Sequence, residues 1–327
     1  MEFNNSLEIL KEPRMIGRST GRYWIALIVI GDDYRSNWEV DAKDSVMSYA
    51  ERFGLGVVIF NDFIDTSAER KPAPWQKLLI GESFLRLDPG ATGVLIMDTD
   101  IIANFLTGEN PFETWDCKKI GMVSKRKNMP YDYLSTAKKI AFYRHHFVST
   151  EYPLDSILLW DVSEVYEHEG LSPVEDECCT GILLMNPQNH ANFLLQIYQS
   201  SLHLGETAAY EQTHVNHSVQ TAGLLQTLDY QFQMIWAFEM AQNFPFLYLD
   251  QFRDQNPLAE HCVLASLLSG TFLHFAGRWS ESDYLAAGKA VSQRMRDSLW
   301  AEYGRYQAAA IKGVARGMIS PPTLTED

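Results

Sequence analysis

The sequence predicts an α/β fold: a single Rossmann-like domain with a mixed, mostly parallel central sheet and a C-terminal helical extension. Three apolar runs, residues 23–30, 55–60 and 93–97, have the length and continuity of strands buried on both faces. Two segments between them, residues 37–53 and 75–87, have the pattern of helices. Strands that alternate with helices in this way predict a parallel sheet covered by helices.

The second half of the chain alternates less regularly. Its expected strands are residues 120–124, 180–186 and 272–275. Its expected helices are residues 134–145, 189–200, 212–228 and 282–318. We therefore divide the chain into an N-terminal segment (residues 1–22), one main domain (23–280) and a helical tail (281–327).

Composition limits the classes of function. The 327 residues are 46% hydrophobic, enough for a large core, and the net charge of −15 argues against a general nucleic-acid or anionic-membrane surface. The four cysteines form no CxxC pair, which favours free thiols in a reducing compartment. Residues 1–22 lack the apolar core of a signal peptide, and residues 23–30 are too few to span a bilayer. We expect a cytoplasmic protein without a transmembrane segment.

The motif Asp98-Thr99-Asp100 directly follows the apolar run of residues 93–97. Carboxylates at the carboxyl end of a buried strand lie at the edge of the sheet where ligands bind in such folds. Mg²⁺ or Mn²⁺ held by one or two carboxylates usually takes further ligands from substrate phosphates and water. The simpler interpretation is a pair of solvated carboxylates in a turn.

Several other motifs accompany it in a fixed order. From the amino terminus they are Gly31-Asp32-Asp33-Tyr34, Trp75-x-Lys77, Asp98-Thr99-Asp100, Cys179-Thr180-Gly181, Glu211-Gln212 and His274-Phe275-Ala276-Gly277. This order resembles the retaining glycosyltransferases of the GT-A fold, in particular the fungal α-galactosyltransferase and plant xyloglucan α-xylosyltransferase family. It is also similar to the bacterial lipopolysaccharide α-galactosyltransferases and to glycogenin. The resemblance covers residues 23–279.

The resemblance implies a UDP-sugar donor and a Mn²⁺ or Mg²⁺ cofactor. Asp98 and Asp100 would hold the cation, with His274 as third ligand, and an imidazole ligand favours Mn²⁺ over Ca²⁺. Taken alone, His274 is better explained as a hydrogen-bonded core histidine. The donor would bind the half of the domain formed by residues 23–116, and the acceptor the region 117–280.

The resemblance also implies donor contacts. These residues are Asp32, Asp33, Tyr34, Lys77, Asp98, Thr99, Cys179, Gly181, Gly277 and Arg278. The ring of Tyr34 would stack on uracil, and Lys77 would approach the pyrophosphate or the sugar. Three positions depart from the family pattern. Cys179 replaces an asparagine that contacts the sugar, Arg278 replaces a lysine that contacts pyrophosphate, and Glu211 stands where the family more often has an aspartate.

Glu211-Gln212 is the expected catalytic pair. A retaining transfer needs either a protein nucleophile or a same-face route in which the leaving phosphate deprotonates the acceptor. Glu211 could be the nucleophile or stabilise the oxocarbenium ion, and Gln212 could orient the reacting centre. The alternative is an ordinary pair at a helix N-terminus, stabilised by the helix dipole.

The acceptor is expected between the DxD motif and Cys178. Basic clusters in this region are Lys125-Arg126-Lys127, Lys138-Lys139 and Arg144-His145-His146, which indicate an anionic acceptor or a solvated helix face. The mixed basic and aromatic residues 289–316 could rest on a membrane or pack against a second subunit. A glycan is the expected acceptor, and a modified nucleic-acid base remains an alternative.

Two further classes remain open. A non-catalytic GT-A-like module that binds sugar nucleotides or glycans is favoured by the departures at Cys179 and Glu211. A phosphatase of the haloacid-dehalogenase type also has a DxD motif after an apolar strand. In those enzymes the motif follows the first strand, whereas two expected strands precede it here.

Overall fold

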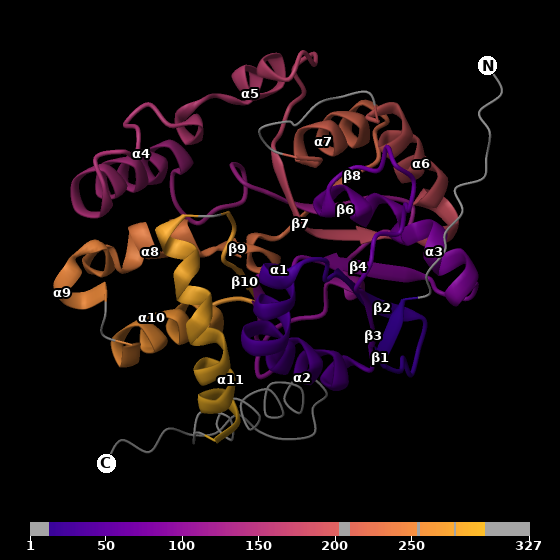
Figure 1. The fold of residues 1–327 in the computed structure, drawn as a ribbon, viewed down its shortest axis with the longest axis horizontal. Helices are drawn as coiled ribbons and strands as arrows, with labels where there is room; N and C mark the ends of the chain where they lie inside the picture. Colours follow the sequence, from indigo (N-terminus) through magenta and orange to yellow (C-terminus); the bar gives the residue numbers. More distant parts are fainter. Residues whose placement is uncertain (1–12, 203–209, 254–255, 278, 298–327) are drawn as a thin grey trace, which may run out of the picture.

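The computed structural model describes residues 13–202, 210–253, 256–277 and 279–297. Its main sheet has seven strands in the order β1-β3-β2-β4-β7-β6-β8 (Figure 1). The strands are β1 (Arg14–Gly17), β2 (Tyr23–Ile28), β3 (Gly56–Phe60), β4 (Gly93–Met97), β6 (Ile120–Ser124), β7 (Cys178–Met185) and β8 (Leu225–Leu228). Of these strands, β1 and β7 run opposite to the other five. The predicted mixed, mostly parallel sheet is confirmed.

Both faces of this sheet are covered. Along β4, Val94 and Ile96 point into one apolar core, and Leu95 and Met97 into the other. The helices over the first core are α3 (Ile80–Leu87), α6 (Pro187–Ser200) and α7 (Gln212–Thr221). Those over the second are α2 (Lys43–Phe53), α4 (Tyr133–Tyr143), α8 (Trp236–Asn243), α10 (Asn256–Leu268) and α11 (Gly288–Asp297). This double burial explains why the central strands have continuous apolar sequences.

A second, three-stranded sheet has the order β5-β10-β9. Its strands are β5 (Ile101–Ala103), β9 (Met234–Ile235) and β10 (Phe272–His274). Strand β5 begins directly after the DxD motif, and its antiparallel register pairs Ile101 with His274. The small sheet therefore brings His274 beside Asp100. The sequence predicts β10 but neither β5 nor β9.

Several element boundaries differ from the predictions. The first helical segment begins at α1 (Asp32–Ser36) and passes through π-helical turns (Asn37–Ala42) before α2. The second begins as a 3₁₀-helix (Ala73–Leu79) before α3. The predicted helix 212–228 is wrong in its last part: α7 ends at Thr221, and β8 follows and pairs with β6. Four helices of the described part were not predicted: α8, α10 and the short helices α5 (Val162–His168) and α9 (Asp250–Arg253).

The two ends of the chain are described in part. Strand β1 falls within residues 1–22 and pairs with β3, so the sheet begins before residue 23. A 3₁₀-helix (Ser280–Ala287) and α11 form the described part of the expected tail, and residues 298–327 lie outside the described part. The four cysteines are free thiols, as predicted. In the described ranges, every helix is too short or too polar to cross a membrane.

Candidate active site

The sheet topology gathers the sequence motifs at one edge. Strands β2, β3 and β4 are parallel, so α1 after β2 and the DxD motif after β4 emerge at the same edge. Strand β7 runs antiparallel to β4, which brings its first residues to this edge too. The backbone N–H of Asp98 donates to the carbonyl oxygen of Gly181 over 2.9 Å. Residues separated by more than 80 positions therefore become neighbours.

Asp98, Asp100 and His274 form a group with the geometry of a cation site. Each residue offers one ligand atom, and these atoms all lie within 4.8 Å of one another. Nε2 of His274 lies 3.2 Å from Oδ1 of Asp100, yet this buried oxygen accepts no hydrogen bond from the residues that the structure describes. Carboxylate and imidazole ligands suit Mn²⁺. The residues present thus fit a divalent cation.

Charge around His274 points to the same conclusion. Burial would lower the pKa of His274, but the Asp100 carboxylate and the Cys179 sulfur raise it well above its ordinary value. Burial would raise the pKa of the Cys179 thiol, but its contact with His274 lowers it. The site therefore favours a positive charge beside Asp100. A metal ion that binds such a site replaces the proton.

Lys77 connects Asp98 of the DxD motif to Glu211. Its ammonium group is 2.8 Å from Oδ1 of Asp98 and 2.9 Å from Oε1 of Glu211, and it donates to the carbonyl oxygen of Thr180 over 3.2 Å. Burial would lower the pKa of Lys77, but the two carboxylates outweigh burial and raise it. Lys77 is only 3% exposed. In this structure the ammonium group of Lys77 contacts Asp98, Glu211 and Thr180, and its contact with a donor stays a prediction.

The two expected catalytic residues have different surroundings. Glu211 is buried at the N-cap of α7, and its Oε1 accepts from the Thr180 hydroxyl over 2.7 Å as well as contacting Lys77. Gln212 is half-buried, and its amide nitrogen lies 3.5 Å from Oε1 of Glu177. Glu211 is thus linked to Asp98 through a single lysine. Gln212 faces a separate ion-pair network.

Position 181 requires glycine because the imidazole of His274 lies too close for a Cβ atom. A Cβ atom there would lie 2.4 Å from Cε1 of His274 and 2.5 Å from the side-chain amide of Gln233. Gly181→Ala is therefore expected to displace the imidazole, weaken Mn²⁺ binding at least tenfold and destabilise the fold by about 1–3 kcal/mol. Calorimetric Mn²⁺ titration and chemical denaturation measure both effects. Gly21→Ala is the control, since a Cβ there meets nothing within 4 Å, and equal Mn²⁺ affinities in the two variants would contradict this role.

The residues that follow β2 divide into two groups. Tyr34 is half-buried, and its pKa is raised first by burial and then by Asp98, Tyr210 and Asp100, so its hydroxyl lies near the DxD motif. Asp32 and Asp33 are exposed in the first turn of α1, where Asp32 lies 3.9 Å from Arg35. The structure thus brings Tyr34 to the site. Among the described residues, Asp32 and Asp33 make no hydrogen bond or ion pair with the other predicted site residues.

The remaining predicted donor contacts lie at different depths. Thr99 is 1% exposed, and its hydroxyl has no hydrogen-bond partner among the described residues. Cys179 is 6% exposed, and its sulfur contacts Nδ1 of His274 at 3.8 Å. Gly277 is exposed and has φ of 88°, a conformation that favours glycine. Arg278 lies outside the described residues.

Two residues at the site were missed by the sequence analysis. Tyr210 directly precedes Glu211 and has φ of 50°, a strained conformation for a residue other than glycine, and such strain often marks functional sites. Gln233 is 1% exposed and its amide lies 2.9 Å from Nδ1 of His274. A lone tyrosine and a lone glutamine carry no motif, so only the spatial arrangement identifies them.

No protein-family model and no curated protein matches the chain. Among solved structures, the apo structure of the bifunctional glycosyltransferase WbbM aligns with 91% of this chain and 52% of its own, with 12% identity and a TM-score of 0.50. A glycosyltransferase involved in glycosylation of the major capsid of PBCV-1 aligns over 80% and 98%, with 11% identity and a TM-score of 0.47. The galactosyltransferase LgtC, in complex with donor and acceptor sugar analogs, aligns over 81% and 95%, with 12% identity and a TM-score of 0.41.

The fold is that of GT-A glycosyltransferases. At 12% identity the similarity to WbbM concerns the fold alone, and the site must be judged on its own residues.

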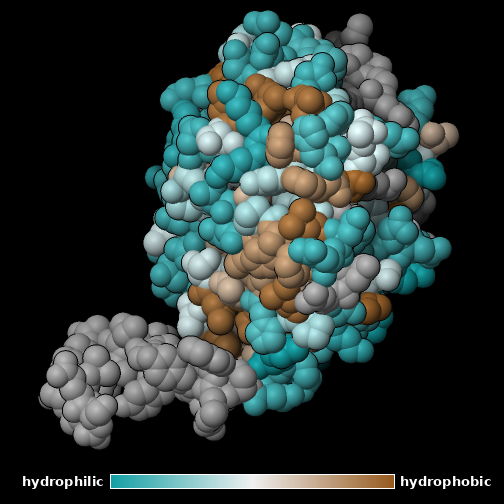
Figure 2. All heavy atoms as spheres, turned by 90° about the vertical axis from the view of Figure 1, so that its left-hand side faces the viewer, coloured by the Kyte–Doolittle hydropathy of each residue, from teal (hydrophilic) through white to brown (hydrophobic). Residues whose placement is uncertain are grey.

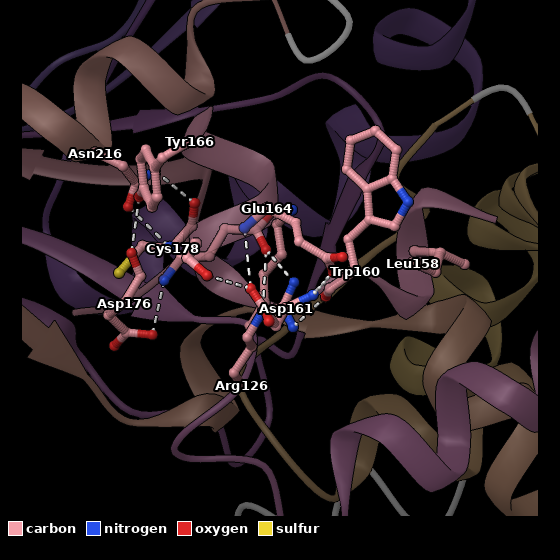
Figure 3. A network of polar contacts seen from close by, with 12 residues as sticks. Arg126, Leu158, Trp160, Asp161, Glu164, Tyr166, Asp176, Cys178 and Asn216 are labelled. Atoms are coloured by element: carbon pink, nitrogen blue, oxygen red, sulfur yellow. Dashed lines mark hydrogen bonds and ion pairs between the residues drawn. The ribbon is translucent and has the colours of Figure 1, made fainter. Parts of the chain in front are cut away.

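Within this GT-A fold, a polar network attaches β7 to the helices around it (Figure 3). The side chain of Asn216 in α7 accepts from the backbone N–H of Cys178 over 2.8 Å and donates to the carbonyl oxygen of Cys178 over 2.7 Å. The hydroxyl of Tyr166 in α5 donates to the carbonyl oxygen of Asp176 over 2.7 Å. The bonds of Asn216 attach α7 to β7, and the bond of Tyr166 attaches α5 to the segment that leads into β7. The attachment of α7 to β7 helps to hold Glu211 beside Thr180.

The basic segment 125–127 does not form a free cationic surface. Lys125 and Arg126 both pair with the buried Glu177, at 2.5 and 2.8 Å, and Lys127 pairs with Glu175 at 2.7 Å. Burial would raise the pKa of Glu177, but Lys125 and Arg126 lower it. The segment therefore gives little support to an anionic or nucleic-acid acceptor. The Glu177 carboxylate in turn forms its ion pairs with Lys125 and Arg126, within the protein.

Exposed apolar side chains gather between residues 134 and 157. Five of them come from α4 and the segment after it, each at least 38% exposed: Leu134, Phe142, Phe147, Leu154 and Ile157. Figure 1 places α4 on the side that faces the viewer in Figure 2, where apolar surface forms a band among polar side chains. Exposed apolar patches often mark interaction sites. This face therefore offers apolar contact area to another molecule.

Proposed function

We propose that the chain is a metal-dependent retaining glycosyltransferase. It transfers a galactose-like hexose or a pentose from a UDP-sugar to a hydroxyl group of an acceptor such as a glycan. The observation that carries this proposal is the arrangement of Asp98, Asp100 and His274 within 4.8 Å, linked through Lys77 to Glu211. The GT-A fold agrees with it.

The cation would be Mn²⁺ or Mg²⁺, bound by the two aspartates and Nε2 of His274. Such an ion neutralises the charge that grows on a departing diphosphate. Tyr34, whose hydroxyl lies near the DxD motif, would provide a flat ring for the uracil. Thr99 and Gly277 lie close in sequence to these ligands, and the small residue at 277 lets the backbone approach a phosphate. Asp32 and Asp33 would contact the nucleoside from α1.

Glu211 is the residue proposed to act at the sugar. Its contacts with Lys77 and Thr180 hold the carboxylate in one position beside a positive charge. An ionised carboxylate can stabilise the positive charge of an oxocarbenium ion by electrostatics. It can also attack the anomeric carbon as the nucleophile of a double displacement. Gln212 would orient the reacting centre through its amide.

Acceptor recognition is proposed for the face around α4. The apolar side chains there suit an acceptor with an apolar part or apolar sugar faces, because they supply contact area without fixed charge. The paired state of Lys125, Arg126 and Lys127 argues against a strongly anionic acceptor.

A thermal-shift panel of UDP-sugars, with and without Mn²⁺, tests the proposed function. A ligand present at 100 times its Kd stabilises the folded state by about 2.7 kcal/mol, which raises Tm measurably. We expect one UDP-sugar to raise Tm, and Mn²⁺ to be required. Stabilisation without any donor hydrolysis or transfer would favour the binding-module alternative. Absence of a shift with every UDP-sugar would contradict the proposal.

A further inference from the structure

Gln233 is buried, and its side-chain amide contacts Nδ1 of His274. Its amide orientation follows from the hydrogen bonds it must make. With the side-chain oxygen toward β7, that oxygen accepts from the backbone N–H groups of Gly181 and Ile182, at 3.2 Å each, and from Nδ1 of His274 at 2.9 Å. The amide nitrogen then donates to the carbonyl oxygen of Cys179 over 3.1 Å. The opposite orientation would aim an –NH₂ group at two N–H donors, which buried groups avoid.

An irregularity in β7 explains why this glutamine has backbone partners. In the ladder between β6 and β7, Met122 pairs with Leu183 but the next residue, Val123, pairs with Cys179. The register shift leaves residues 180–182 without partners on β6. Bulges of this kind free backbone groups and often lie next to active sites. The Gln233 side chain supplies the acceptor that two of these N–H groups need.

The same glutamine oxygen determines which ring nitrogen of His274 carries the proton. Once a cation replaces the second proton, the imidazole is neutral and carries one proton; an acceptor at Nδ1 holds that proton there, which leaves the lone pair on Nε2. Nε2 lies 3.2 Å from Oδ1 of Asp100, and that oxygen accepts no hydrogen bond from the described residues. Two acceptor atoms at this distance need a positive charge between them. The fixed tautomer therefore presents a ligand atom to the cation position.

We propose that Gln233 is a positioning residue that fixes the tautomer and the ring orientation of His274, so that Nε2 serves as the metal ligand. The inference rests on the proposed function, because it concerns the same cation site. Gly181 completes the arrangement, since a Cβ atom there would meet both the imidazole and the Gln233 amide within 2.5 Å. Cys179 is a second neighbour of Nδ1, but its sulfur lies at 3.8 Å, farther than the glutamine oxygen.

The test measures Mn²⁺ affinity by calorimetry in metal-free full-length protein, together with the ¹⁵N NMR signals of His274 in Mg²⁺-loaded protein. Gln233→Met removes the acceptor and keeps the length of the side chain. Loss of the outer partner of a metal-bound histidine typically weakens metal binding roughly 10- to 100-fold, which is the expected result. Gln233→Glu keeps an acceptor at the same position and should retain most of the affinity. Gln231→Met, two residues earlier and half-buried, is the matched control and should bind Mn²⁺ as the wild type does.

The outcomes separate a positioning role from a structural one. A structural role alone predicts a lower Tm for Gln233→Met with an unaltered Kd for Mn²⁺ and unaltered His274 signals, and that result would overturn the inference. If Gln233→Met does not fold, Gln233→Glu decides, because affinity lost in this variant contradicts the acceptor role. Cys179→Ala should weaken binding less than Gln233→Met, and the reverse order would assign the role to the thiol. Wild-type protein that binds no Mn²⁺ would instead refute the metal site itself.

Discussion

Replacing Asp100 with asparagine is expected to abolish Mn²⁺-dependent hydrolysis and transfer of the donor. The variant keeps the shape of the side chain but loses the charge that faces His274 across 3.2 Å. Because Asp100 would bind the cation directly, Mn²⁺ affinity should fall by more than the roughly 10- to 100-fold that loss of an outer-shell partner costs. Calorimetric titration with Mn²⁺ and an assay of UDP release measure the two effects.

Asp283→Asn is the matched control for this experiment. Asp283 is exposed in the 3₁₀-helix after β10, so its loss should change neither Mn²⁺ affinity nor turnover. Asp100→Asn protein that folds and still releases UDP at the wild-type rate would remove Asp100 from the reaction.

Glu211→Gln is expected to lower kcat by about 100-fold or more while the Kd for the UDP-sugar changes less than about threefold. The amide keeps an oxygen that can accept from Thr180, but it has no negative charge with which to stabilise an oxocarbenium ion or form a glycosyl ester. Lys77 retains Asp98 as a partner. The loss in unfolding free energy should therefore stay below the ~3–5 kcal/mol of a fully broken buried ion pair.

Steady-state kinetics and donor binding, measured on the same preparation, test the role of Glu211. Glu167→Gln in α5, an exposed position, is the control for the loss of one carboxylate. The opposite pattern, with a weakened Kd and an unaltered kcat, would restrict Glu211 to donor binding. If kcat and donor affinity both fall in proportion to a lower Tm, Glu211 has a structural role.

The central sheet could be predicted because its strands are buried on both faces. Strands β2, β3, β4 and β7 therefore have long apolar sequences that few other elements share. The small sheet escaped prediction because β5 and β9 have only three and two residues, too few for a periodic pattern. Strand β8 was mistaken for the end of a helix, since Leu225–Leu228 is half polar and half-buried and follows α7 after a short turn.

The site was predictable where a residue belongs to a motif with a chemical meaning. Asp98, Asp100 and His274 carry ligand atoms, and the structure brings them together. The partners of Lys77 could not be read from the sequence, because Asp98 and Glu211 reach it through the pairing of β4 with β7 and the packing of α7. Gln233 was hidden for the same reason. Its role depends on a bulge that only the register of β6 and β7 reveals.

Anomalous diffraction at the manganese edge, from crystals grown with Mn²⁺ and UDP, tests the central claim most directly. The account predicts one strong peak about 2.1 Å from a carboxylate oxygen of Asp98 or Asp100 and in contact with Nε2 of His274, with the diphosphate of UDP beside it. A manganese peak elsewhere on the molecule, with UDP bound away from β4, would contradict it.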